Sequence, residues 1–155
     1  MSGTPQFTDA DIRDVEFGRD VRVVRPVNLY GCRIGDGAFI GPFCEIQRGV
    51  VIGRGTRVQS HTFICELVSI GQDCFIGHGV KFTNDTFATG GPARGDRSQW
   101  RSTTVGNNVS IGSNATILPV RIADGVVIGA GAVVTRDLEE RGVYAGNPAK
   151  LLRRL

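Results

Sequence analysis

An apolar residue recurs at every sixth position along most of the chain. The series is unbroken over 34–82, resumes over 105–117 and, after a slip of one residue, continues over 122–134. Upstream, the same spacing is present over 17–29. A period of six cannot keep apolar side chains on one face of an α-helix, so the pattern predicts short strands rather than helices.

The residues between these apolar positions suit corners. A small or β-branched residue stands two places before each apolar one, and in a strand these two side chains share a face. The positions that follow are rich in Gly, Asn and Asp, which tolerate the backbone angles of tight turns. Most of the 22 glycines among the 155 residues lie there. With three hexads to a triangular coil, the eighteen hexads predict an all-β prism of about six coils, roughly 25–30 Å tall.

We expect one domain over residues 1–155 with three departures from the regular coil. The break in the hexads predicts a loop at about 85–104. Residues 1–16 and a short C-terminal helix at about 147–155 are expected to cap the two open ends. The helix is predicted because Asn147 suits the N-cap, Pro148 suits the first turn, and basic residues follow near the C-terminus.

Charge and composition narrow the function classes. The net charge is +3, and the 16 arginines are scattered without a dense basic run, so we expect no nucleic-acid partner. The first ten residues are polar and the longest apolar run has about ten residues, so neither a signal peptide nor a membrane span is expected. The four cysteines form no Cys-x-x-Cys pair. Cys44 and Cys74 take the small inward position, and a thiol nucleophile is not expected. We therefore predict a cytoplasmic protein with reduced cysteines.

Two of the hexads and the C-terminal stretch resemble a known family. The segments 34–39 (IGDGAF), 76–81 (IGHGVK) and 145–150 (AGNPAK) are similar to the repeats and closing motif of the hexapeptide-repeat acyltransferases. The resemblance implies a left-handed parallel β-helix, a homotrimer with sites between subunits, and acetyl-CoA as cosubstrate. It implies that CoA lies along the outer corners of the last coils. The candidate contacts are Gly112, Ser113, Gly129, Ala130, Gly131, Asn147 and Lys150.

A narrower resemblance lies at residues 82–85 (FTND), directly before the break. It is similar to the subgroup that N-acetylates nucleotide-linked amino sugars, including UDP-linked 3-amino uronic acids and dTDP-linked 3- or 4-amino deoxyhexoses. The resemblance implies that Asn84 lies at the active site, holding the acceptor or polarising the thioester carbonyl. Asp85 fits a catalytic role and a simple corner role equally well.

The loop and the histidines supply the other candidates. A long loop in a regular solenoid is usually functional, although it can also pack against a neighbour. Its basic and aromatic residues suit a diphosphate and a sugar or base: Arg94, Arg97, Trp100 and Arg101. His78 is a candidate base or acceptor-binding residue, whereas His61 fits a solvated corner better. Two histidines cannot supply the three zinc ligands of a β-helix carbonic anhydrase, so no metal is expected.

These observations predict an acetyl-CoA-dependent N-acetyltransferase that acts on a nucleotide-linked amino sugar, within surface polysaccharide synthesis. An O-acetyltransferase that uses His78 or His61 as base is one alternative. A non-catalytic β-helix scaffold is another, and the intact closing motif and the Asn-Asp loop argue against it.

Overall fold

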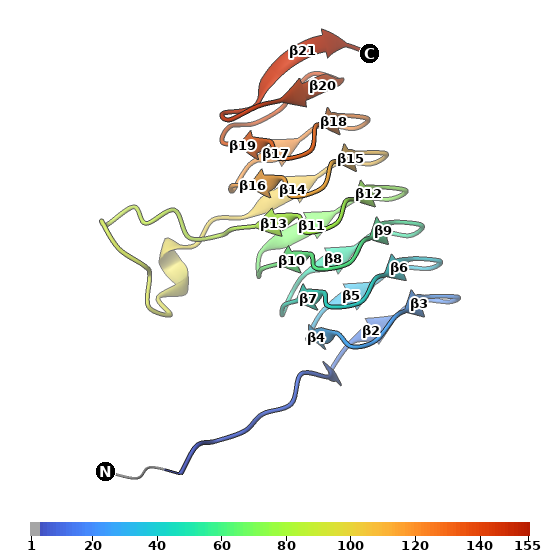
Figure 1. The fold of residues 1–155 in the computed structure, drawn as a ribbon, viewed down its shortest axis with the longest axis vertical. Helices are drawn as coiled ribbons and strands as arrows, with labels where there is room; N and C mark the ends of the chain where they lie inside the picture. The colour runs from blue at the N-terminus through green and yellow to red at the C-terminus, as the bar shows by residue number, and fades with distance from the viewer. Residues whose placement is uncertain (1–3) are drawn as a thin grey trace.

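The computed structural model describes residues 4–155 as a column of short strands in three parallel sheets (Figure 1). The first sheet contains β1 (Ile12–Arg13), β4 (Asn28–Tyr30), β7 (Glu45–Ile46), β10 (Phe63–Ile64), β13 (Lys81–Phe82), β16 (Thr116–Ile117) and β19 (Val133–Val134). The second contains β2 (Glu16–Phe17), β5 (Arg33–Ile34), β8 (Val51–Ile52), β11 (Val68–Ile70), β14 (Thr103–Val105) and β17 (Arg121–Ile122). The third contains β3 (Arg22–Val23), β6 (Phe39–Ile40), β9 (Arg57–Val58), β12 (Phe75–Ile76), β15 (Ser110–Ile111), β18 (Val127–Ile128), β20 (Gly142–Ala145) and β21 (Lys150–Arg154).

The chain visits the three sheets in turn, so each circuit forms one coil of a left-handed parallel β-helix. Strands one coil apart pair in parallel, as in Phe63 with Glu45 and Ile34 with Ile52. The apolar hexad residues from Leu29 to Val134 point inward and are almost fully buried. The six-residue period therefore predicted the strands and the core correctly.

The structure has about seven turns rather than the six that we expected. The difference lies at the N-terminal end, where β1 pairs with β4 and begins a further coil. Residues 1–16 are thus partly coil rather than only a cap, and residues 1–3 lie outside the described part. Phe17, the first hexad residue, stays 43% exposed because little of the chain lies beneath it.

Two corners of the prism position the functional candidates. The loop corner joins the first sheet to the second and includes residues 47–49, 65–67 and 83–102. The histidine corner joins the third sheet to the first and includes residues 41–43, 59–61, 77–79, 112–114 and 129–131. The two corners therefore lie at opposite ends of the strands of the first sheet.

The expected loop is present and projects from the loop corner (Figure 1). It leaves after β13, contains the 3₁₀ helix η1 (Arg97–Gln99), and ends where β14 begins at Thr103, slightly before the predicted boundary. β14 then pairs with β11 in regular register, with Thr103 opposite Val68. Within residues 4–155, no helix has the length and apolar character needed to cross a membrane.

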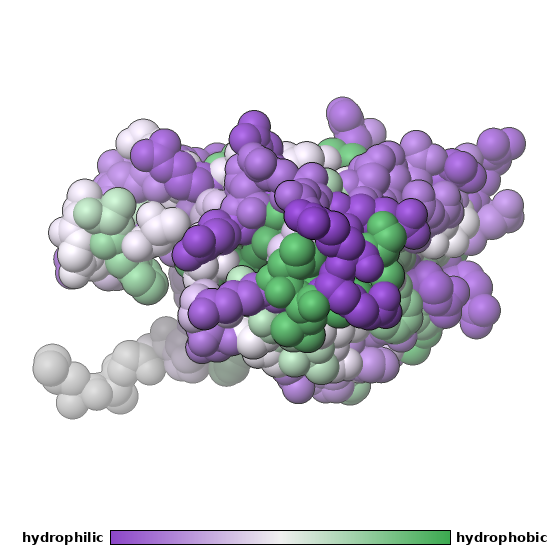
Figure 2. Space-filling model, turned by 90° about the horizontal axis from the view of Figure 1, so that it is seen from above, coloured by the Kyte–Doolittle hydropathy of each residue, from purple (hydrophilic) through white to green (hydrophobic). Residues whose placement is uncertain are grey.

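The expected C-terminal helix is wrong. Residues 150–154 form β21, which pairs antiparallel with β20 at the end of the third sheet. The edge of β20 offers unpaired backbone groups, and the returning chain satisfies them as a strand. The hairpin covers the C-terminal end of the prism, where hydrophobic side chains lie among hydrophilic ones (Figure 2). Leu151, Leu152 and Leu155 remain exposed on it.

Candidate functional site

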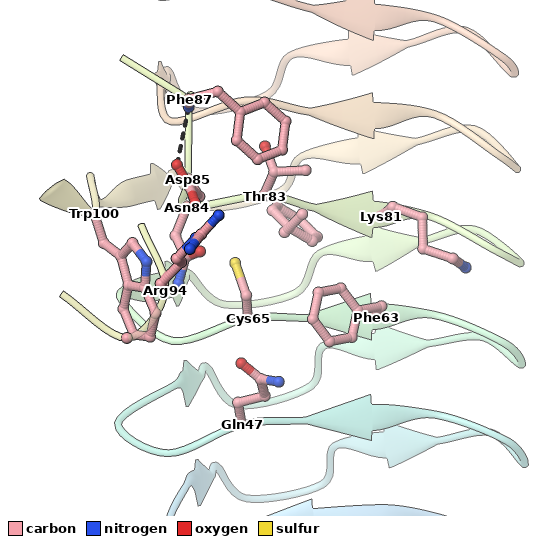
Figure 3. Close-up of a pocket in the computed structure, with 12 residues that line it drawn as sticks. Gln47, Phe63, Cys65, Lys81, Thr83, Asn84, Asp85, Phe87, Arg94 and Trp100 are labelled. Atoms are coloured by element: carbon pink, nitrogen blue, oxygen red, sulfur yellow. Dashed lines mark hydrogen bonds between the residues drawn. The ribbon is translucent and has the colours of Figure 1, made fainter. Parts of the chain in front are cut away.

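A pocket of about 450 Å³ lies between the base of the loop and the first sheet (Figure 3). Strands β10 and β13 of the first sheet, the corners that follow β7 and β10, and the loop contribute its walls. The lining residues are Gln47, Phe63, Cys65, Lys81, Phe82, Thr83, Asn84, Asp85, Phe87, Arg94, Gly95 and Trp100. Four residues predicted from the sequence, Asn84, Asp85, Arg94 and Trp100, are thus brought together.

Asn84 is held at the point where the loop leaves the coil. Its side-chain Nδ2 donates to the backbone carbonyl of Glu66, 3.2 Å away. Its backbone carbonyl accepts from the backbone N–H of Arg101 at 2.9 Å. Its Oδ1 forms no hydrogen bond with the residues that the structure describes. The amide group is therefore fixed in place while its oxygen stays available to a ligand donor.

Asp85 also lines the pocket, but its carboxylate is engaged. One oxygen accepts from the N–H of Phe87 at 2.9 Å, and the other accepts from the N–H of Ala93 at 2.7 Å. The first bond closes a turn and the second ties together two parts of the loop eight residues apart, so the contacts favour a structural role for Asp85.

The three arginines of the loop differ in their contacts. Arg94 lines the pocket, and its guanidinium forms no ion pair within residues 4–155. Arg97 instead pairs with Glu66 and lies over the ring of Trp100, 5.7 Å from its centroid. Arg101 contributes its backbone N–H to Asn84 and keeps its side chain exposed. Only Arg94 is therefore free to meet an anion in the pocket.

Phe63 and Cys65 form the apolar wall beneath Asn84 (Figure 3). Burial raises the pKa of the Cys65 thiol to about 12, because the charged thiolate would lose its hydration there. Cys65 thus stays a neutral thiol near pH 7, which supports the expectation that no cysteine acts as nucleophile.

Both histidines lie on the histidine corner, at the other end of the first-sheet strands from Asn84. His78 is exposed, and its Nδ1 lies 2.9 Å from the hydroxyl of Ser60. His61, one coil below, stacks on the ring of Phe43. Lys81 lies between the two corners. It lines the pocket, and its ammonium donates to the carbonyls of His61 and Gly79 on the histidine corner. His78 and Asn84 are therefore not brought into one pocket.

Most of the residues predicted to contact CoA continue the histidine corner in the next two coils. They are Gly112, Ser113, Gly129, Ala130 and Gly131. The remaining two lie at the C-terminal hairpin. Lys150 lines a cavity of about 310 Å³ there, and Asn147 lies in the turn between β20 and β21 instead of capping a helix. Among the described residues, no cluster of three or more His, Cys, Asp or Glu side chains could hold a metal ion.

The coils match two family models. That of the bacterial transferase hexapeptide (six repeats) matches residues 31–66, and that of the hexapeptide repeat of succinyl-transferase matches residues 67–80 and 102–136. The chain belongs to the hexapeptide-repeat transferase family. The two models together match more than half of this family member and leave out the projecting loop.

Individual relatives agree with this assignment. This hexapeptide-repeat protein is 37% identical to a chloramphenicol acetyltransferase of Agrobacterium fabrum, over 77% of its own chain and 52% of the relative. It is 31% identical to the bifunctional protein GlmU of Acidithiobacillus ferrooxidans, over 86% of its own chain and 31% of that protein. The chain thus spans about a third to a half of these curated relatives.

A solved structure shares the fold over nearly the whole chain. It is that of a mutant of AntD, an N-acyltransferase from Bacillus cereus, in complex with dTDP and coenzyme A. The TM-score is 0.68 at 19% identity, and the match covers 92% of this chain and 84% of AntD.

Sequence reasoning missed the residues that join the loop to the coil, chiefly Glu66. Its N–H donates to Gln47, its carbonyl accepts from Asn84, and its carboxylate pairs with Arg97. Glu66 stands 18 residues before Asn84, which is one coil length. The coil period was therefore a signal that could have placed Glu66 directly beneath Asn84.

Proposed function

We propose that this chain transfers an acetyl group from acetyl-CoA to the amino group of a nucleotide-linked amino sugar. The observation that carries the proposal is that Asn84 lines the pocket with its amide nitrogen bonded to Glu66 and its amide oxygen unbonded among the described residues. The ligand classes come from the sequence resemblance and from the dTDP and coenzyme A bound to AntD.

The side chains divide the work in this proposal. Asn84 Oδ1 accepts a hydrogen bond from the sugar amine and directs the nitrogen lone pair toward the thioester carbonyl. Its nitrogen is already bound to Glu66, so holding the acceptor is the better role for this amide than polarising the carbonyl. Arg94 meets an anionic group of the acceptor, and Trp100 offers an apolar face to the sugar. An uncharged amine attacks without a general base, and the departing thiolate takes the proton.

The wider parts of the proposal rest on the family resemblance. They are that the protein is cytoplasmic, that it forms a homotrimer with sites between subunits, and that its product enters surface polysaccharide synthesis. CoA then lies along the histidine corner of the last coils, where small residues let the pantetheine arm approach the backbone.

A second candidate function, O-acetylation, is favoured by one observation. Nδ1 of His78 lies 2.9 Å from the Ser60 hydroxyl. In the tautomer in which Nδ1–H donates to this hydroxyl, Nε2 is unprotonated and can serve as a base for a hydroxyl acceptor. The chloramphenicol acetyltransferase relative fits this alternative.

An acceptor panel tests the proposal. UDP- and dTDP-linked 3- and 4-amino sugars and hydroxyl acceptors are supplied with acetyl-CoA, and thiol release is followed for wild type, Asn84→Ala and His78→Ala. We expect turnover of an amino sugar, a fall in kcat/KM of about a hundredfold in Asn84→Ala, and less than a tenfold fall in His78→Ala.

Two outcomes would contradict it. Turnover of hydroxyl acceptors alone, with activity lost in His78→Ala, would establish the O-acetyltransferase. The absence of any thermal shift with millimolar CoA would instead favour a non-catalytic scaffold.

A further inference from the structure

An exposed aromatic pair stands on the histidine corner, outside the pocket. The rings of Phe43 and His61 stack across two consecutive coils, with centroids 4.8 Å apart and an angle of 29° between their planes. Phe43 is 57% exposed, and His61 is exposed as well. The acetyl-transfer roles described above use neither ring.

The backbone at this pair is strained. Phe43 and His61 have φ of 61° and 63°, in the left-handed region that disfavours residues with a bulky side chain. The following coils place Gly79, Asn114 and Gly131 at the same corner position, and these residue types accept that conformation readily. Strained residues gather at ligand-binding positions, where a required side chain outweighs the local penalty. The two rings thus stand where the corner itself would favour glycine or asparagine.

The stack ends at His61, and a positively charged side chain lies beside its upper end. The residue above His61 is Gly79, which has no side chain, so no side chain at that position covers the upper face of the His61 ring. The ammonium of Lys81 donates to the carbonyls of both His61 and Gly79 and therefore lies between these two residues. It forms no ion pair with a carboxylate in the described part of the chain. An exposed ring beside a cation that has no ion pair in the described part of the chain suits a planar base linked to a phosphate.

The aromatic pair is continuous with the Asn84 pocket. His61 and Phe63 are two residues apart at the entry to β10, and Phe63 lines the pocket. Lys81 lines the pocket, and its side chain extends along the first sheet away from Asn84 (Figure 3). Its ammonium donates to the backbone carbonyl of His61. A ligand that crosses the first sheet from Asn84 therefore passes Lys81 before it meets the rings.

We propose that Phe43 and His61 form a stacking platform for the nucleobase of the acceptor, with Lys81 binding its phosphates. This inference rests on the proposed function, because it places the nucleotide of the same acceptor. CoA carries a base too, but its expected contacts lie on the C-terminal side of the coil that holds Asn84, whereas the pair lies on the N-terminal side. The acceptor and CoA thus approach the coil of Asn84 from opposite ends of the column.

Direct binding measurements test the platform. Dissociation constants for UDP, dTDP, CoA and 4′-phosphopantetheine are measured by calorimetry on the full chain, for wild type, Phe43→Asn and His61→Asn. Asparagine removes each ring and still accepts the left-handed backbone. Phe75→Ala is the matched control, because Phe75 is a comparably exposed phenylalanine on the third sheet. Melting temperatures confirm that each variant is folded.

We expect the dissociation constant for the better-bound nucleoside diphosphate to rise about tenfold or more in each ring variant, as the loss of a base–aromatic stack predicts. Affinities for CoA and 4′-phosphopantetheine stay unchanged, and Phe75→Ala behaves as wild type. Independently of any variant, UDP or dTDP added to wild type shifts the imidazole proton resonances of His61, while CoA does not.

Three results would overturn the platform alone: unchanged nucleoside diphosphate affinity in both variants, a loss of CoA affinity instead, or a changed oligomeric mass that makes the rings a subunit contact. A wild-type protein that binds CoA but neither UDP nor dTDP would overturn the proposed acceptor itself. The two failures are therefore distinguishable.

Discussion

Burial governs the chemistry of the four cysteines. Loss of hydration raises the pKa of Cys32 to about 11 and that of Cys65 to about 12, and it also raises the pKa values of Cys44 and Cys74. Cys32 and Cys65 are therefore neutral in the folded protein well above the pH at which they ionise in the unfolded chain. The raised pKa values therefore affect the free energy of unfolding. Their stabilising contribution is fully present below about pH 9, where the thiols are neutral in both states, and it is lost as the pH rises toward 12.

Cys65→Ala isolates this effect. We expect the wild-type free energy of unfolding to fall more steeply above pH 9 than that of Cys65→Ala, by up to about 1.4 kcal/mol per pH unit, because one ionisable thiol is removed. Urea denaturation at pH 8, 9, 10 and 10.5 measures both slopes. Parallel slopes for the two proteins would show that Cys65 ionises equally in the folded and unfolded states.

At this scale, the sequence predicted residues whose signal is local. Asn84, Asp85, Arg94 and Trp100 belong to a motif and the loop that follows it, and the structure gathers them in one pocket. Phe63 was missed because it lines the pocket from the coil below, and Glu66 was missed because it binds Asn84 from that same coil. Only the register between coils reveals either position. The partner of Arg97 was missed for the same reason, since its position depends on the path of the loop.

Among the elements, the corners set the tightest steric limits. A Cβ on Gly53 would run into the backbone carbonyl of Gly71, one coil above, because both turns approach closely. The backbone there is fixed by ladder bonds, including the one from Gly53 N to Ile70 O at 2.9 Å. A side chain at this corner must therefore displace the backbone itself.

Gly53→Ala tests this limit. We expect a loss of about 1–3 kcal/mol of unfolding free energy, as in other overpacked sites, measured by denaturant titration. Gly91→Ala in the loop is the matched control, since a Cβ there meets nothing within 4 Å, and it should stay within about 0.5 kcal/mol. An equally small loss for Gly53→Ala would mean that the corners yield easily.

The strands and the C-terminal segment differ in what the sequence could establish. The hexads predicted strands because each one encodes its own inward pair and its own turn, so local and tertiary preferences agree. At 147–155 the local preferences favour a helix, but the open edge of β20 outweighs them by pairing with β21. The extra coil at β1 was missed because its residues gain their partners only from β4.

For the whole molecule, the question is how the projecting loop is used. It extends away from the column and carries Phe87 with 59% of its surface exposed (Figure 1). The Asn84 pocket opens beside it, so a neighbouring copy that packs against the loop also meets the pocket. This arrangement supports the proposed trimer.

Light scattering tests the trimer directly. We expect a mass near three times the 16.6 kDa of one chain at micromolar concentration. Phe87→Ser should shift the protein toward smaller species, because it removes an apolar contact that the loop offers. A wild-type mass equal to one chain would leave the site between subunits without a basis.

The register on either side of the loop has a further consequence. β11 pairs with β14 as regularly as with β8, so the column closes over the departure point as though nothing had been inserted. We therefore expect changes in the length or composition of the loop to leave the packed interior intact, because no residue of 83–102 belongs to the buried core cluster. A lineage could therefore exchange the whole loop, which carries the proposed acceptor contacts, while inheriting the column and the proposed CoA corner unchanged.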